Sequence, residues 1–298
     1  ELMELHTVGM IYTEADVQAA AKLLTGLTVG AGGTYAYNAA RHATGAVTVL
    51  DFSHANATAD GGEAAALALL DHLARHPATA DRIATKLCVR FVADQAPATL
   101  VARLAKVYLD NGTAIAPVLR ALFTSPEFAA AVGQKVRTPF EDLAATVRAL
   151  GLGPEAAGVK ALDALYNTLV SAGNAPLRWA PPNGYPDVAA AWASPSAFLM
   201  RCNSHLNLAA GWYPTQLTRP ADLLKALVPV RPATYGGLVD ALARRLLGTT
   251  LPAAQTAAVL SVAGKLPTSS LTSGDTSVAG SLPYLIALVL DSPTFQLR

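Results

Sequence analysis

Apolar residues recur along most of the chain with the three-to-four-residue spacing of amphipathic helices. After the dipeptide His76-Pro77, one such stripe runs through residues 83–92, and a second, through 101–108, stops at Asn111-Gly112. A third stripe covers residues 115–123. Asparagine followed by glycine is typical of a helix end, because both residues tolerate the left-handed backbone found there. The dominant period therefore predicts a helical protein.

Helix starts are marked repeatedly by a serine or threonine followed by proline. Thr138-Pro139-Phe140-Glu141 combines a capping hydroxyl, a proline at the first helical position and a glutamate that completes a capping box. The Ser-Pro part of this signal recurs at residues 125–126, 194–195 and 292–293. Strand-like residues are confined to 34–37 and 46–50. We predict a mainly α, multi-helix, bundle-like domain with a small β element near residues 34–50.

One pattern occurs twice in the chain. Residues 118–128 and 285–295 both consist of an apolar helical run, then Ser-Pro, then a phenylalanine. Two further amphipathic segments precede each copy, around residues 80–110 and 235–264. This pattern predicts a duplicated three-helix unit, with chance likeness between Ala- and Leu-rich helices as the alternative.

The segment from Gly173 to Pro186 is dense in proline, glycine and asparagine, which is typical of a loop or a boundary. We therefore expect an N-terminal helical part with the small β element over residues 1–173. Residues 174–298 would hold the Pro/Gly/Asn-rich loop and a C-terminal helical part. One continuous domain is the alternative.

Composition changes this picture in two respects. The 298 residues include 52% hydrophobic and only 14% charged residues, with a mean hydropathy of +0.33. Apolar runs such as 285–290 are nevertheless far shorter than the ~20 residues of a spanning helix, so we predict no transmembrane segment. The formal net charge is +1, and this gives no electrostatic basis for binding nucleic acid.

The chain begins with Glu1-Leu2-Met3-Glu4-Leu5-His6, a sequence typical of the inside of a helix. We expect that an N-terminal part of the protein precedes it and could be a partner of this chain. Any site shared with that part would be only half represented in residues 1–298.

Histidines and carboxylates give the candidate catalytic residues, His6, His42, Asp51 and His54. His42 and His54 flank the strand-like segment together with Asp51, in a stretch rich in glycine, asparagine and threonine. Polar residues on irregular backbone are often functional, and the alternative is that these histidines cap turns or bond backbone carbonyls. His72 and His76 have the i, i+4 spacing of a metal pair, but His76 precedes Pro77 at an expected helix end. We therefore predict no metal site.

The densest cluster of aromatic and polar residues lies between Trp179 and Asn203. Aromatic faces beside amide, carboxylate and guanidinium groups suit carbohydrate or peptide recognition, because rings supply apolar area and polar groups give direction. A rigid proline-rich loop whose rings fill the helical core is the alternative. The candidate substrate-binding residues are Asn183, Tyr185, Asp187, Trp192, Arg201 and Asn203.

Several motifs together resemble a bacterial protein family, domain of unknown function 1800, in its C-terminal portion. They are residues 1–9, His42-Ala43-Thr44-Gly45, residues 76–92, Ser125-Pro126-Glu127-Phe128, residues 181–187, Trp192 and residues 199–203. Their order covers nearly the whole chain. The family pattern often has aspartate where Ala43 stands here; this puts the chemistry in doubt if that aspartate is catalytic and changes little if it only caps a turn. The resemblance implies a longer, exported protein of the periplasm or cell envelope, and it supplies no reaction.

Two functions are consistent with these residues. The first is an exported hydrolase acting on an envelope or extracellular polymer, in which His6, His42, Asp51 and His54 would meet Asn183, Asp187 and Arg201 across a cleft. A histidine would then act as general acid or base, and Arg201 would hold an anionic group. The second is a noncatalytic envelope or partner-binding protein, in which His42→Ala lowers stability and leaves activity unchanged. No motif identifies a cofactor, and neither Cys88 nor Cys202 lies in a redox or metal motif.

Overall fold

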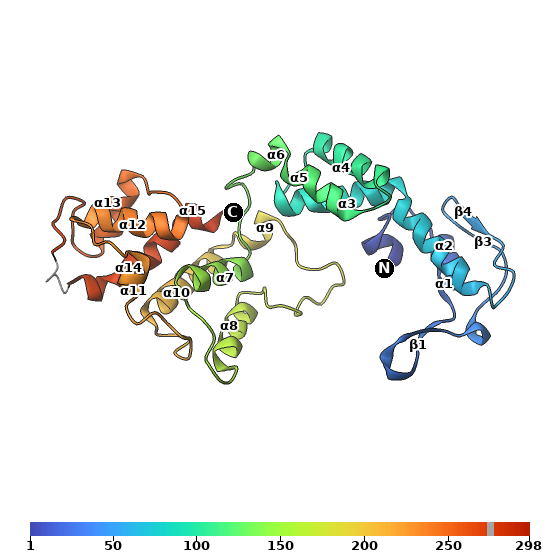
Figure 1. The fold of residues 1–298 in the computed structure, drawn as a ribbon, viewed down its shortest axis with the longest axis horizontal. Helices are drawn as coiled ribbons and strands as arrows, with labels where there is room; N and C mark the ends of the chain where they lie inside the picture. Colours follow the sequence, from blue (N-terminus) through green and yellow to red (C-terminus); the bar gives the residue numbers. More distant parts are fainter. Residues whose placement is uncertain (273–276) are drawn as a thin grey trace. The chain divides into compact units, whose positions relative to one another are not determined.

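The computed structural model describes residues 1–272 and 277–298 (Figure 1). The chain forms two compact units, Glu1–Ala131 and Val132–Arg298, each with its own hydrophobic core. Helices make up most of both units, and the strands belong to two small two-stranded sheets. The prediction of a mainly α protein with a small β element is confirmed. No helix within the described ranges is both long and apolar enough to cross a membrane.

The first unit begins with short elements and ends with helices. Its N-terminal part comprises η1 (Leu2–His6), α1 (Glu14–Leu24), β1 (Leu27–Val29), η2 (Ala31–Gly33), β2 (Tyr35–Tyr37), η3 (Ala39–Arg41), β3 (Val47–Val49) and β4 (Phe52–His54). The helices that follow are α2 (Gly62–Arg75), α3 (Pro77–Phe91), α4 (Ala98–Asp110), α5 (Ile115–Phe123) and α6 (Pro126–Ala129). Strands β2 and β3 match the two predicted strand segments, whereas their partners β1 and β4 were not predicted.

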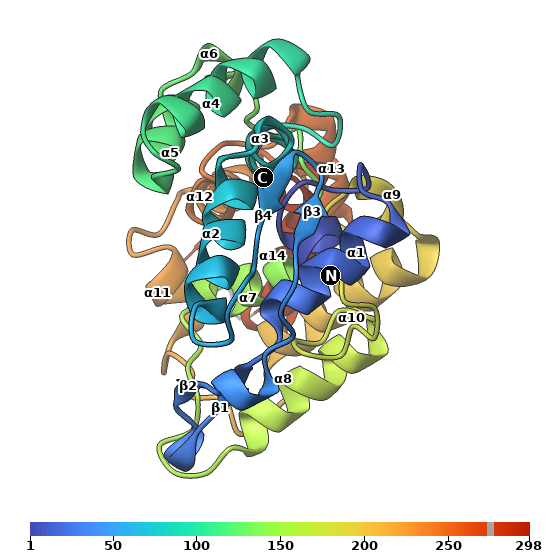
Figure 2. The same cartoon turned by 90° about the vertical axis from the view of Figure 1, so that its right-hand side faces the viewer.

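Each strand pair is an antiparallel hairpin. Val47 pairs with His54 and Val49 with Phe52, so Leu50 and Asp51 form the tip of the β3–β4 hairpin. An oxygen of Asp16, on α1, accepts a 2.6 Å hydrogen bond from the Leu50 amide and fixes this tip. Strand β3 contacts α1 and β4 contacts α2 (Figure 2). The valines of β3 are buried with Leu23, Leu69 and Leu73 in one core of this unit.

A second core in the same unit joins α3, α4 and α5. The predicted apolar stripes supply it, with Ala84, Cys88, Leu100, Leu104 and Leu122 all buried. His76 begins α3 by accepting a 3.1 Å hydrogen bond from the Ala78 amide, with Pro77 at the first helical position. The helix boundary expected at His76-Pro77 is therefore the junction between α2 and α3.

The second unit is built from helices around one core. They are α7 (Pro139–Ala149), α8 (Lys160–Ser171), α9 (Ala189–Trp192), α10 (Pro195–Ala210), α11 (Leu223–Leu227), α12 (Tyr235–Leu247), α13 (Ala253–Ser261), α14 (Ser277–Leu290) and α15 (Pro293–Gln296). Helix α14 packs against both α10 and α12. The predicted capping box is present, because Thr138 accepts from the Glu141 amide and Glu141 accepts from the Thr138 amide.

Both copies of the repeated pattern form the same local structure. In the first copy α5 is followed by the Ser-Pro helix α6, and in the second α14 is followed by α15. Two helices precede each copy, α3 and α4 or α12 and α13. The duplication itself stays a prediction.

The division into units differs from the division expected from composition. Helices α7 and α8 precede the Pro/Gly/Asn-rich loop, yet Leu143, Leu150 and Leu169 belong to the core of the second unit. The loop at 173–186 consequently lies inside that unit, and the units divide between Ala131 and Val132.

Candidate functional site

The candidate residues fall into two groups, one in each unit. His6, His42, Asp51 and His54 lie in the first unit, whereas Asn183, Tyr185, Asp187, Trp192, Arg201 and Asn203 lie in the second. Their meeting in one cleft stays a prediction. The environment of each group is described separately below.

The His42 side chain is buried and connects three segments of the chain through hydrogen bonds and packing. Its Nδ1 lies 2.8 Å from the carbonyl oxygen of Thr25, and its Nε2 lies 2.7 Å from Oδ1 of Asn56. The side-chain amide nitrogen of Asn56 in turn donates to the carbonyl of Ala43 at 2.8 Å. A Cβ at Gly62 would collide with the His42 ring, so the start of α2 packs directly on this histidine. These contacts hold the segments after α1, before β3 and before α2 together.

Asp51 lies at the exposed hairpin tip, beside histidines of the α2–α3 junction. Its Oδ1 is 2.7 Å from Nε2 of His72 and 4.0 Å from Nε2 of His76. The hydrogen bond from His72 lowers the pKa of the Asp51 carboxyl below its ordinary value. The His72 ring also packs against Phe52, with ring centroids 5.3 Å apart.

His54 and His6 have different surroundings. The His54 ring stacks on Phe52, and its Nδ1 accepts a 2.9 Å hydrogen bond from the backbone N–H of Asn56. Asn56 thereby joins His54 to His42. His6 ends η1 and is exposed, and the structure records no hydrogen bond or ion pair for it among the described residues. No set of three His, Cys, Asp or Glu side chains in the described part of the chain has a geometry that could hold a metal ion.

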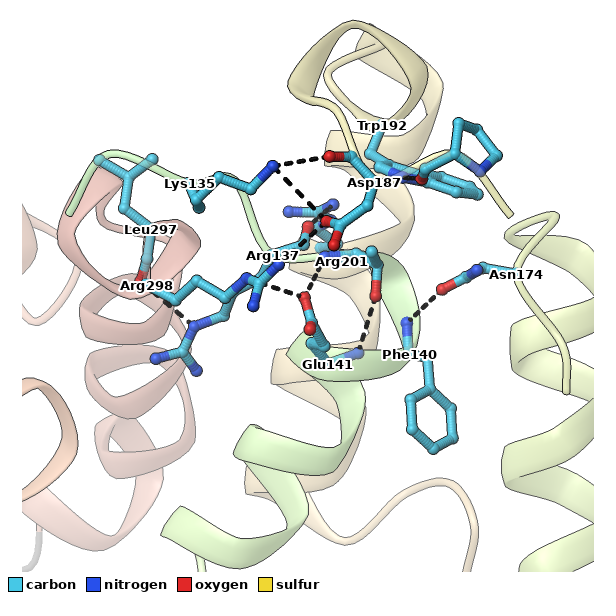
Figure 3. A network of polar contacts seen from close by, with 12 residues as sticks. Lys135, Arg137, Phe140, Glu141, Asn174, Asp187, Trp192, Arg201, Leu297 and Arg298 are labelled. Atoms are coloured by element: carbon cyan, nitrogen blue, oxygen red, sulfur yellow. Dashed lines mark hydrogen bonds and ion pairs between the residues drawn. The ribbon is translucent and has the colours of Figure 1, made fainter. Parts of the chain in front are cut away.

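In the second unit, Asp187 and Arg201 belong to a network that fixes residues 296–298 (Figure 3). Asp187 Oδ1 accepts from Arg298 at 2.9 Å and lies 3.6 Å from Nζ of the buried Lys135. Arg298 Nε is also 3.3 Å from the Glu141 carboxylate. The chain end pairs with residues 135–137 through backbone hydrogen bonds in both directions between Lys135 and Arg298.

Arg201 is buried, and two of its guanidinium nitrogens have partners within the protein. One donates to the Arg137 carbonyl at 2.7 Å, and another donates to Gln296 at 3.1 Å. Burial lowers the pKa of both the Arg201 and the Arg137 guanidinium, although both remain far above neutrality. The side chain predicted to hold an anionic group thus ties α10 to the start of α7 and to α15.

The aromatic residues of the 173–192 segment hold this loop together. The rings of Trp179 and Tyr185 are 5.0 Å apart, and those of Tyr185 and Trp192 are 5.9 Å apart. Trp192 donates to the Pro186 carbonyl at 2.8 Å, and Trp179 donates to Asn183 at 2.9 Å. The polar groups of Asn183, Tyr185 and Trp192 therefore bond within their own segment.

Among the candidates, His54 lines an open cavity beside the β3–β4 hairpin, Arg201 lines a cavity of only about 20 Å³, and Asn203 lines a third cavity. This third cavity has a volume of about 200 Å³ and lies between α8, α10 and the segment after α10. Asn207, one turn further along α10, lines it as well, and neither amide has a side-chain hydrogen bond recorded among the described residues. Tyr213 contributes an exposed ring. The lining holds no charged side chain within the described part of the chain.

Three hydroxyl side chains complete the polar lining. Those of Thr168 and Ser204 donate to carbonyls of their own helices, at 3.0 and 2.9 Å, and Ser171 does the same at 3.1 Å. Each such oxygen keeps lone pairs for accepting a further hydrogen bond. Leu143, Leu165 and Met200 supply apolar surface between them. The result is a small neutral cavity with both donors and acceptors on an apolar background.

His205, which the sequence analysis did not select, is the most strongly perturbed histidine. It is fully buried on α10, with Nε2 3.0 Å from Asp142 on α7 and Nδ1 2.7 Å from Asp291 after α14. Although burial lowers the pKa of this imidazole, the hydrogen bonds to both carboxylates raise it to about 9. His205 is therefore a cation that joins three helices. Its two carboxylate partners lie 63 and 86 residues away in the sequence, so no local sequence pattern indicates this pairing.

Cys202 lies one position from Arg201 and close to this charged group. Burial, together with the negative charge of Asp291, raises the pKa of its thiol to about 12. A thiol with such a pKa is protonated at neutral pH, and the thiolate is the reactive form. Cys202 is thus unsuited to act as a nucleophile.

Comparison with known proteins places the chain in one family. A model of the family described as "Protein of unknown function (DUF1800)" matches residues 1–297, and the chain belongs to that family. No curated protein and no solved structure matches the chain. Its function has to be inferred from its own geometry.

Proposed function

We propose that this chain is a noncatalytic, partner-binding protein of the bacterial cell envelope, and that the cavity between α8 and α10 receives an uncharged ligand. The observation that carries the proposal is the pair of amides on that cavity, Asn203 and Asn207, whose hydrogen-bonding groups have no recorded partner in the described structure. Convergent polar groups on an apolar cavity are the usual composition of a binding site. The envelope location is part of the proposal and follows from the family resemblance.

The engagement of His42, His205 and Arg201 within the protein supports binding over catalysis at these residues. His42 is buried and held on both ring nitrogens, and His205 is a cation between two carboxylates. A general base needs an unprotonated nitrogen within reach of substrate. Arg201 is committed to partners within the protein.

The test incubates the purified protein with isolated cell-wall polymer and measures both co-sedimentation and the release of soluble fragments. We expect co-sedimentation without release. The double variant Asn203→Ala/Asn207→Ala should reduce bound protein about tenfold or more, because each lost hydrogen bond to a ligand contributes roughly 1 kcal/mol. The matched control is Asn167→Ala, an exposed asparagine on α8. Release of fragments by the wild type would overturn the noncatalytic assignment.

A hydrolase remains a second proposal because of one specific arrangement, the pair of the exposed Asp51 and the half-buried His72. In a catalytic triad a carboxylate orients the histidine that activates the nucleophile. Asp51 and His72, 2.7 Å apart, have the arrangement of these two members, and the carboxylate is accessible to solvent. If fragments are released, Asp51→Asn and His72→Gln should abolish the release. Release that survives both changes would exclude this pair as its source.

A further inference from the structure

The lining of the α8–α10 cavity defines the charge of its ligand. No acidic or basic side chain lines it within the described residues. The charged groups of Asp142, His205 and Asp291 are not part of this lining and pair with one another inside the unit. An ionised ligand entering such a cavity would lose its hydration without gaining a counter-charge, which costs several kcal/mol. Phosphate, carboxylate and ammonium groups are therefore poor occupants.

The polar groups of the cavity also define the functional groups of the ligand. Asn203 and Asn207 are separated by one helical turn, so their side chains lie on the same face of α10, with Cβ atoms about 5–6 Å apart. Each amide presents a donor and an acceptor, and the hydroxyl oxygens of Thr168 and Ser204 present acceptors. Neighbouring ligand hydroxyls, each of which can donate and accept, satisfy this mixture.

Aromatic and apolar surface accompanies these groups. Tyr213 lines the cavity and is 48% exposed, and its neighbour Trp212 is 55% exposed and pairs edge-on with Tyr284 at 6.4 Å. Leu165 and Met200 supply further apolar lining. Large exposed rings beside a polar cavity suit a ligand that has apolar C–H faces as well as hydroxyls. Sugar rings combine these two properties.

From these three features we infer that the cavity is a binding site for a neutral glycan, with sugar hydroxyls on Asn203 and Asn207 and a ring face on Tyr213. This inference rests on the proposed binding function and names its ligand class. A peptide is the alternative occupant, and the experiment separates the two.

The experiment measures affinity by calorimetry for two neutral oligosaccharides, a β-1,4-linked glucose hexamer and the corresponding N-acetylglucosamine hexamer, using the full chain. We expect saturable binding of at least one of them. Asn203→Ala and Asn207→Ala should each weaken it about fivefold, and Tyr213→Ala should weaken it similarly. Asn167→Ala should leave it unchanged. Circular dichroism of every variant verifies that the fold is retained.

Each outcome bears on a different statement. One possible outcome is that neither oligosaccharide binds, whereas uncharged peptides from a library bind and lose affinity in the Asn203 and Asn207 variants. This outcome overturns the glycan inference and leaves the proposed binding function standing. Oligosaccharide binding that is indifferent to Asn203, Asn207 and Tyr213 overturns the assignment of this cavity. Failure of both probe classes, together with the absence of co-sedimentation with cell-wall polymer, overturns the proposed function as well.

Discussion

At the scale of single residues, the charge on His205 follows from its partners. Both ring nitrogens face carboxylate oxygens, and a carboxylate accepts hydrogen bonds, so both nitrogens must carry protons. The resulting imidazolium neutralises part of the charge of Asp142 and Asp291. A buried carboxylate without such a partner would be strongly destabilising, because ions lose their hydration on burial.

This arrangement predicts a loss of stability in alkaline solution. The pKa of His205 rises from its ordinary 6.5 to about 9 in the folded protein, so its contribution is complete below pH 6.5 and disappears as the pH rises through 9. The contribution is roughly 3 kcal/mol at most. Urea unfolding between pH 6 and 10 should show this decline, and an NMR titration should place the midpoint of His205 near 9. Asp291→Asn removes one carboxylate and should lower that midpoint. An unchanged midpoint would contradict the account.

The candidate residues show how far sequence alone can reach at this scale. The polar character of His42, Asp187 and Arg201 was evident from the sequence, whereas the partners that each contacts within its own unit were not. The roles of His205 and Asn207 were not evident. One depends on carboxylates 63 and 86 residues away, and the other depends on a cavity that exists only once α8 packs near α10.

At the scale of elements, the sequence predicted helix starts correctly where the capping residue and the amide that it bonds are only a few positions apart. Ser125 and Ser194 cap α6 and α10 as their Ser-Pro sequences predict, and Thr138 forms its capping box. Strands β1 and β4, Leu-Thr-Val and Phe-Ser-His, were missed. Their pairing is determined by hairpin register and by packing on α1 and α2.

The two Ser-Pro helices of the repeated pattern provide a matched pair. The Ser125 hydroxyl accepts a 3.1 Å hydrogen bond from the Phe128 amide, whereas the Ser292 hydroxyl oxygen is buried without a partner among the described residues. Ser125→Ala should therefore lower the free energy of unfolding by about 1 kcal/mol. Ser292→Ala removes an unsatisfied buried group and should be neutral or slightly stabilising. Chemical denaturation of both variants measures the difference, and equal losses would show that the second cap is also formed in solution.

At the scale of the whole molecule, composition located a loop but not a domain boundary. Residues 173–186 are rich in proline and glycine, yet Tyr185 donates to the Ala175 carbonyl and the loop belongs to the second unit. A boundary depends on which core each helix joins. That depends on long-range contacts, such as those of Leu143 and Leu169 with the core of the second unit, which a local pattern does not contain.

The same contacts predict which fragment of the chain folds. Residues 132–298 contain a complete core and all three members of the Asp142–His205–Asp291 group, so this fragment should unfold cooperatively and lose stability as the pH passes 9. Residues 174–298, cut at the boundary suggested by composition, lack α7 and α8 and leave His205 with a single carboxylate. This matched fragment should show no cooperative transition. Circular dichroism during urea unfolding compares the two. Equal cooperativity would mean that α7 and α8 are dispensable for the core, and disorder of the longer fragment would mean that residues 1–131 are required for it.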